Sequence, residues 1–124
     1  MAYQIPVLDI TLEAAADLSA KQFHFVKVSA ANKVDVCTAI TDAPIGVLQN
    51  KPTSGQAANI RVLGISKLSA NAAIAAGAIL GSSTDSQAQT AVATNVVCAR
   101  ALEAAGAANV IISALVLPGT SIKA

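Results

Sequence analysis

Apolar side chains recur at every second residue along much of the chain, which is the pattern of half-buried β-strands. The clearest rows lie in residues 7–13 and 110–117. Shorter runs of strand-like residues, separated by Pro, Gly, Asn and Ser residues that favour turns, occupy residues 23–28, 34–40, 45–49, 60–63, 65–68, 87–92 and 96–102. Strands at this spacing predict an all-β fold, a small β-sandwich or barrel of about 8–10 short strands.

Two alanine-rich stretches, residues 14–20 and 69–81, compete with this interpretation, since alanine is the best helix former. Gly77 interrupts the second stretch and would cost roughly 1 kcal/mol in a helix interior. We therefore expect an irregular bend followed by a short strand there, and at most one or two short helical turns in the whole chain.

The stretch PIGVLQNKPTSGQAANIRVLG, residues 44–64, resembles a later part of the same chain. Residues 56–60 align with 106–110, residues 46–50 with 99–103, and residues 18–23 with 74–79. The difference in residue number between aligned positions changes along the chain. Loops of unequal length between paired strands would produce such a change. We predict an internal two-fold repeat with halves at about 18–64 and 74–117, and chance similarity of alanine-rich sequence is the alternative.

The predicted boundaries follow from these patterns. An extended N-terminal arm covers residues 1–10, because Pro6 suits an extended segment that lacks a backbone donor. A single β domain covers residues 11–117. Pro118 and Gly119 are expected to end the last strand, which leaves residues 118–124 as a C-terminal tail.

Composition and charge argue against nucleic-acid and membrane partners. The 124 residues suit one domain; they are 54% hydrophobic but only 2% aromatic, and the net charge is +1. Without a basic patch or stacking aromatic residues, we expect no nucleic-acid partner. We also expect no membrane partner and synthesis in the cytoplasm, because no signal peptide opens the chain and no apolar run reaches the ~18 residues of a membrane span.

Catalytic chemistry has little support in this sequence. His24 is the single histidine, Cys37 and Cys98 lie in strand-like runs, and the acidic residues are scattered. Three or four ligands are needed for a zinc site, and a nucleophilic cysteine needs an activating neighbour. We therefore predict no enzyme, no catalytic residue, no cofactor and no metal, and we interpret both cysteines as reduced and buried, with a disulfide between them as the open alternative.

The order of several segments resembles the small capsid decoration, or cement, proteins of tailed bacteriophages. The segments that carry this resemblance are LSAKQFHFVKV at 18–28, DAPIGVL at 42–48, GQAANIRV at 55–62, IAAGAILG at 74–81, RALEAAGAAN at 100–109 and the strand at 110–117. Together they span most of the chain. The sequence departs from the family pattern at Lys21, where glycine is common, and in the longer loop at 50–55.

This resemblance implies a virion structural protein on the outer surface of an assembled icosahedral capsid, where it bridges subunits of the major capsid protein as a homotrimer. An extended arm can add a strand to an exposed sheet edge, so the first candidates for capsid contact are Ala2, Tyr3, Gln4, Ile5, Pro6, Val7 and Leu8. The secondary candidates are Asn50, Lys51, Pro52 and Thr53, together with the tail. The alternatives are another virion β module, such as a head fibre base or a tail accessory, and a soluble carbohydrate-binding module.

Overall fold

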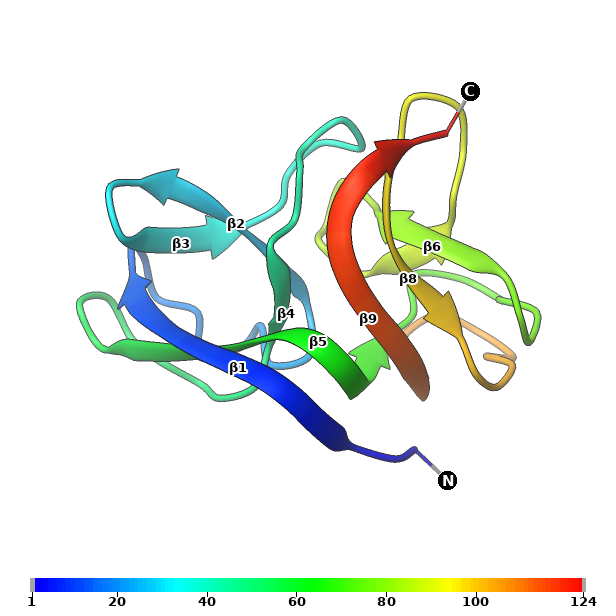
Figure 1. The fold of residues 1–124 in the computed structure, drawn as a ribbon, viewed down its shortest axis with the longest axis horizontal. Coiled ribbons are helices and arrows are strands. Elements are labelled where there is room, and N and C mark those ends of the chain that lie inside the picture. The colour runs from blue at the N-terminus through cyan, green and yellow to red at the C-terminus, as the bar shows by residue number, and fades with distance from the viewer. Residues whose placement is uncertain (1, 124) are drawn as a thin grey trace.

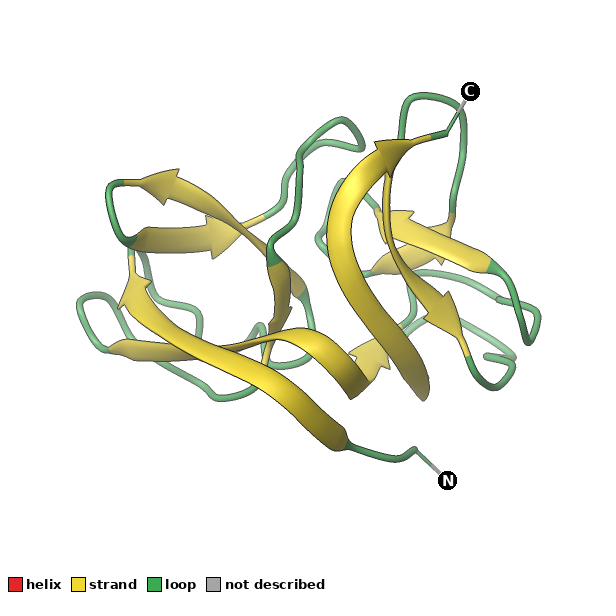
Figure 2. Cartoon of the chain, in the orientation of Figure 1, coloured by secondary structure: helices red, strands yellow, loops and turns green. Residues whose placement is uncertain are grey.

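The computed structural model describes residues 2–123, and the side chains of all of these except 118–120. This part of the chain contains nine strands and no helix (Figures 1 and 2). The strands are β1 (Ile5–Ala14), β2 (Phe25–Ala30), β3 (Lys33–Val36), β4 (Gly46–Leu48), β5 (Ala57–Ser69), β6 (Ile79–Ser82), β7 (Ala88–Thr90), β8 (Val96–Ala101) and β9 (Ile111–Ile122). The predicted all-β class is confirmed, and neither alanine-rich stretch is helical.

All nine strands belong to one continuous sheet, in the order β1-β3-β2-β4-β5-β9-β8-β6-β7, rather than to two stacked sheets. Because β1 also pairs with β5, the first five strands in this order close into a ring. We call that ring lobe 1. Lobe 2 consists of the second part of β5 with β9, β8, β6 and β7, and it closes through one parallel bridge between Ala70 and Ala88. The two lobes lie side by side along the longest axis of the molecule (Figure 1).

Strand β5 is shared by both lobes. The sequence predicted two strands here, at 60–63 and 65–68, but the structure has one strand of 13 residues. Gly64 lies at its centre, with Pro6 of β1 paired on one side and Val116 of β9 paired on the other. At φ +124° and with the carbonyl oxygen of Ile5 only 2.4 Å from where a Cβ would lie, this position requires glycine. Gly64 therefore lets three strands meet.

Two strands extend beyond their predicted limits. Strand β9 continues through Pro118 to Ile122, so the expected strand end at 118–119 was wrong. A proline fits here because β9 bulges: Val97 and Ala99 of β8 pair with Ser121 and Val116, which leaves the residues between out of the ladder. At the other terminus, β1 begins at Ile5, so residues 5–10 of the predicted arm form part of lobe 1.

The backbone pairing of the two lobes matches. In lobe 1, β1 and β3 run parallel, with Ala14 opposite Val34, and Ala70 lies opposite Ala88 in the same way in lobe 2. The amide of Gly55 donates to Ala14, as that of Asn109 donates to Ala70. Both Gly55 and Asn109 have positive φ. The two lobes therefore correspond in fold, and a duplicated sequence stays a prediction. The sequence alignment places residue 55 opposite residue 105, whereas these hydrogen bonds place it opposite residue 109.

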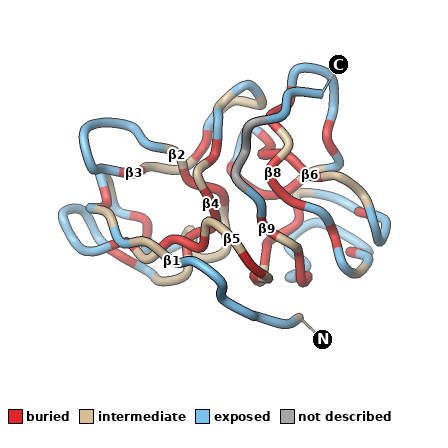
Figure 3. The backbone as a smooth tube through the Cα atoms, in the orientation of Figure 1, coloured by how far each residue is buried: buried red, intermediate tan, exposed pale blue. Residues whose placement is uncertain are grey.

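Buried side chains form two clusters. One fills the ring of lobe 1 and includes Val26, Val34 and Ile60. The other fills lobe 2 with Leu68, Leu80, Ile112 and many alanines, and it also takes in Phe25 and Val47 from lobe 1 strands. Buried segments run along β4 and β5, where the lobes meet, and along β8 inside lobe 2, while the beginning of β1 is exposed (Figure 3).

Candidate functional site

We call Ala2–Leu8, the part of the predicted 1–10 arm that holds the first capsid-contact candidates, the arm. Its strand residues, from Ile5 on, are paired to the body along one edge only. Ile5 lies opposite Ile65, Pro6 opposite Gly64 and Leu8 opposite Leu63. The other edge of β1 has no strand partner before Glu13 within residues 2–123. An apolar strand with one open edge can accept another strand.

The side chains of this arm are exposed on both faces of the strand. The exposed fraction is 60% for Tyr3, 55% for Ile5, 67% for Val7 and 51% for Leu8. Large apolar side chains gathered in this way on a protein surface mark interaction sites. The arm therefore offers apolar side chains and unpaired backbone groups in the same place.

A partly buried ion pair holds β1 against β5 just beyond the arm. Arg61 is only 7% exposed. Its Nε and Nη2 atoms donate to the two carboxylate oxygens of Asp9 at 2.9 and 3.1 Å, and Nη1 donates to the carbonyl of Ile65 at 3.1 Å. A two-point contact between a guanidinium and a carboxylate fixes orientation as well as distance. The arm is thus fixed to the body at its C-terminal end.

The secondary candidates, residues 50–53, form the start of the β4–β5 connection. The side chain of Asn50 donates to the carbonyl of Ala57 at 2.9 Å and accepts from the amide of Asn59 at 3.0 Å. Pro52 is buried, and its carbonyl accepts from the amide of Leu18 at 2.9 Å. Lys51 and Thr53 are exposed. The loop is therefore held in place, and two of its four candidates can contact a partner.

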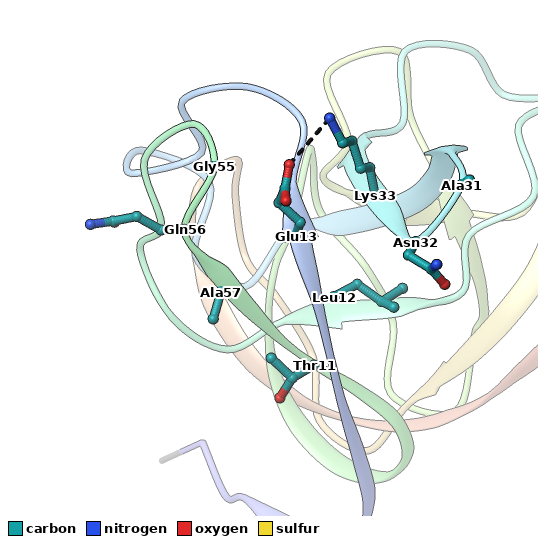
Figure 4. A pocket seen from close by; sticks show the side chains of 9 residues that line it. All are labelled: Thr11, Leu12, Glu13, Ala31, Asn32, Lys33, Gly55, Gln56 and Ala57. Carbon is teal, nitrogen blue, oxygen red and sulfur yellow. Dashed lines mark ion pairs between the residues drawn. The ribbon is translucent and has the colours of Figure 1, made fainter.

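An open pocket of about 500 Å³ lies at the outer end of lobe 1, beyond this loop. We call it the end pocket. It is lined by Thr11, Leu12 and Glu13, by residues 31–33 of the β2–β3 turn, and by residues 55–57 (Figure 4). Glu13 and Lys33 point toward each other there and form an ion pair at 3.2 Å. Sequence reasoning missed this pocket because it joins three short segments that share no motif.

The groups considered for catalysis lie elsewhere. His24 Nδ1 is 2.7 Å from Ser86 Oγ, and burial, followed by nearby Lys21, lowers the pKa of His24. Cys37 and Cys98 are both buried and unbridged. Burial raises the pKa of Cys37 to about 12 and also raises that of Cys98, so neither thiol forms a thiolate near neutral pH.

Residues 2–123 contain no group of three or more His, Cys, Asp and Glu side chains placed to hold a metal ion. The same residues contain no helix with the length and apolar character to cross a bilayer.

An all-β scaffold that presents an apolar strand edge defines a structural or binding module of the β class. The chain belongs to the phage cement protein family, whose model matches residues 3–117. Membership in this family implies a non-enzymatic structural protein of the phage virion. A comparison with curated protein sequences found no match.

Among solved structures, the chain is similar to the N base of the head fiber protein gp8.5 of bacteriophage phi29. The TM-score is 0.66 at 16% sequence identity, and the alignment covers 92% of this chain and 97% of that chain. At this identity the similarity is one of fold.

Proposed function

We propose that the protein binds the outer surface of an assembled icosahedral phage capsid and stabilises the shell by bridging subunits of the major capsid protein. The family places the chain among phage cement proteins. The observation that carries the proposal is the N-terminal arm, Ala2–Leu8, which combines exposed apolar side chains with an open strand edge.

The contact we propose is strand addition. An extended segment of the major capsid protein pairs with the open edge of β1 and covers Ile5, Val7 and Leu8, all of which are more than half exposed. Backbone hydrogen bonds supply most of the affinity in this mode of recognition, and alternate side chains supply the specificity. Because the Asp9–Arg61 pair anchors β1 to β5, a load on the arm is passed into lobe 1.

We further propose that the protein acts as a homotrimer on the shell. Each copy then contributes one arm, so three modest contacts act together. Linked contacts of this kind raise the overall affinity well above that of one contact, and a closed symmetric assembly repeats the same interface at each subunit.

The test uses undecorated capsids of the parent phage mixed with purified protein. We expect stoichiometric co-sedimentation, and we expect Val7→Asp to weaken binding at least tenfold, because a charge would be buried against an apolar partner. The matched control is Val92→Asp, at an exposed apolar residue in the β7–β8 connection. Equal binding by both variants would remove the arm from the proposal, and failure of the wild-type protein to bind would reject the function.

A head fibre base is the second candidate, because the fold is similar to that of the phi29 head fiber N base. Imaging of an intact particle distinguishes the two functions. A cement protein covers repeated positions over the whole shell, whereas a fibre base lies at the foot of a projecting fibre.

A further inference from the structure

The end pocket of lobe 1 has a counterpart in lobe 2, and in lobe 2 that counterpart is filled. Since Ala14 corresponds to Ala70 and Val34 to Ala88 in the matching parallel pairs, positions in the two lobes can be related residue by residue. Thr11 and Glu13 of the pocket then correspond to Lys67 and Ser69. Ala31 and Asn32 of the β2–β3 turn correspond to Asp85 and Ser86, and both Asn32 and Ser86 have positive φ.

The segment Phe23–Phe25 of lobe 1 occupies the counterpart in lobe 2. The amide of Ser69 donates to the carbonyl of Phe23 at 3.0 Å, and the amide of Phe25 donates to the carbonyl of Ser86 at 2.9 Å. Lys67 Nζ lies 5.9 Å from the centroid of the Phe23 ring, and His24 Nδ1 lies 3.3 Å from the carbonyl oxygen of Asp85. Each of these four lobe 2 residues corresponds to a residue that lines the end pocket.

Lobe 2 presents a segment of the same backbone shape at its own outer end. Gly77–Ile79 corresponds to Phe23–Phe25, because Gly77 donates to Ala101 at 2.8 Å as Phe23 donates to Leu48 at 2.7 Å. Gly77 has φ +85° and Phe23 has φ +67°. In lobe 2 the amide of Ala101 donates back to the carbonyl of Ala78, and in lobe 1 the amide of Leu48 donates back to the carbonyl of His24.

We propose that the end pocket is the docking site for a second copy of the chain, which inserts residues 77–79 as Phe23–Phe25 is inserted within one copy. The junction between the lobes is thereby repeated between molecules. One difference must be overcome: the backbone amide of Glu13 donates to the carbonyl of Asn32 at 3.1 Å, whereas the amide of Ser69 and the carbonyl of Ser86, which correspond to them, both bond to the inserted segment. One backbone bond opens and two form.

The end pocket of lobe 1 and the segment of residues 77–79 in lobe 2 lie at opposite ends of the longest axis of the molecule. The end pocket is beside the β2–β3 turn, and the connection that leads into β6 is at the other end (Figure 1). A contact between two different surfaces is heterologous, so it closes into a ring or continues as a fibre. This self-association does not depend on the shell and is separate from strand addition at β1.

A cross-linking experiment tests the proximity. Ala31→Cys and Ala78→Cys are prepared as separate variants and treated with a short bis-maleimide, alone and mixed. We expect a cross-linked dimer in the mixture at least tenfold more abundant than in either variant alone. The buried Cys37 and Cys98, with their raised pKa values, do not compete. A mixture without this excess would overturn the proposal.

Sedimentation velocity over a range of concentrations tests the affinity. We expect the wild-type protein to associate with rising concentration, and we expect Ala31→Trp at the pocket rim to weaken association at least tenfold. Ala93→Trp, at an exposed alanine in the β7–β8 connection, is the matched control and should associate normally. A wild-type protein that stays monomeric, or an Ala31→Trp variant that associates like the control, contradicts the proposal. A protein that binds capsids yet fails here rejects the end-to-end contact alone.

Discussion

Single residues decide where the strands of this protein can meet. Gly64 is the clearest case, because β1, β5 and β9 pass one another at its α-carbon. Gly55 also has a positive φ, of +83°, but it has open space around it. Both positions therefore need glycine for its backbone conformation, but only Gly64 also needs it because another strand passes close by.

We predict that Gly64→Ala lowers the free energy of unfolding by at least about 3 kcal/mol, since the new Cβ adds a clash with the backbone of Ile5 to an unfavourable φ. Gly55→Ala should cost about 1–2 kcal/mol, from the left-handed conformation alone. Urea denaturation of both variants measures the difference. Equal losses would show that β1 moves away from Gly64 at little cost.

At the scale of elements, the connections between strands are held by side chains that bond to the backbone. The β3–β4 connection is an example: a single carboxylate oxygen of Asp42 accepts from Lys27 Nζ at 2.9 Å and from the amides of Thr38 and Ala39 at 2.8 and 3.1 Å. Burial acts to raise the pKa of Asp42, but these three bonds together outweigh it, so the pKa lies below the ordinary value for an aspartate.

This shift predicts a loss of stability in acid. Because the pKa of Asp42 is lower in the folded than in the unfolded protein, its contribution is present above about pH 4 and disappears as the pH falls through the folded pKa. We expect the urea concentration at the midpoint of unfolding to decrease when the pH is lowered below about 4. Asp42→Asn should be less stable than the wild type at pH 7 and should lose less on acidification. An identical pH profile for the two proteins would contradict this role.

Most elements could be predicted from the alternation of apolar residues, and the failures have physical causes. Gly64 predicted a break, but here glycine permits close approach of strands within one continuous β5. Pro118 predicted an end, but it lies where β9 leaves the ladder and needs no backbone donor. The apolar pattern predicts a strand from Phe23, but Phe23 lies before β2 with a positive φ, and its carbonyl accepts a hydrogen bond from the amide of Ser69 in the other lobe.

The candidate site was predicted only in part. An extended, apolar N-terminus could be predicted from Pro6 and its neighbours, but its pairing with β5 could not, since that depends on a glycine 58 residues away in the chain. The end pocket depends on three segments brought together by ring closure of lobe 1. Local sequence patterns carry no signal for such long-range contacts.

At the scale of the whole molecule, the two lobes form one folding unit. They share β5, and the core of lobe 2 includes Phe25 and Val47 from strands of lobe 1. Hydrogen bonds from Ser69 to Phe23 and from Phe25 to Ser86 also cross between them. Loss of either lobe therefore removes part of the support of the other.

We predict a single cooperative unfolding transition for the whole chain. Ile60→Ala in the core of lobe 1 and Leu80→Ala in the core of lobe 2 should each lower the free energy of unfolding by about 2–5 kcal/mol without splitting the transition. Circular dichroism and hydrogen exchange in amides of both lobes should report the same midpoint for each variant. Separate midpoints for the lobes would show that they fold independently.

Because β5 is shared by both lobes, it also limits how the sequence of such a protein can change during evolution. A deletion that removed the first half would strip β5 of the strands that flank Arg61, and one that removed the second half would expose the amides and carbonyls of residues 64–69. Either remnant would display bare sheet edge and would be prone to aggregate. We therefore expect both halves to be kept together, with variation in the loops at the two ends and not in the number of lobes.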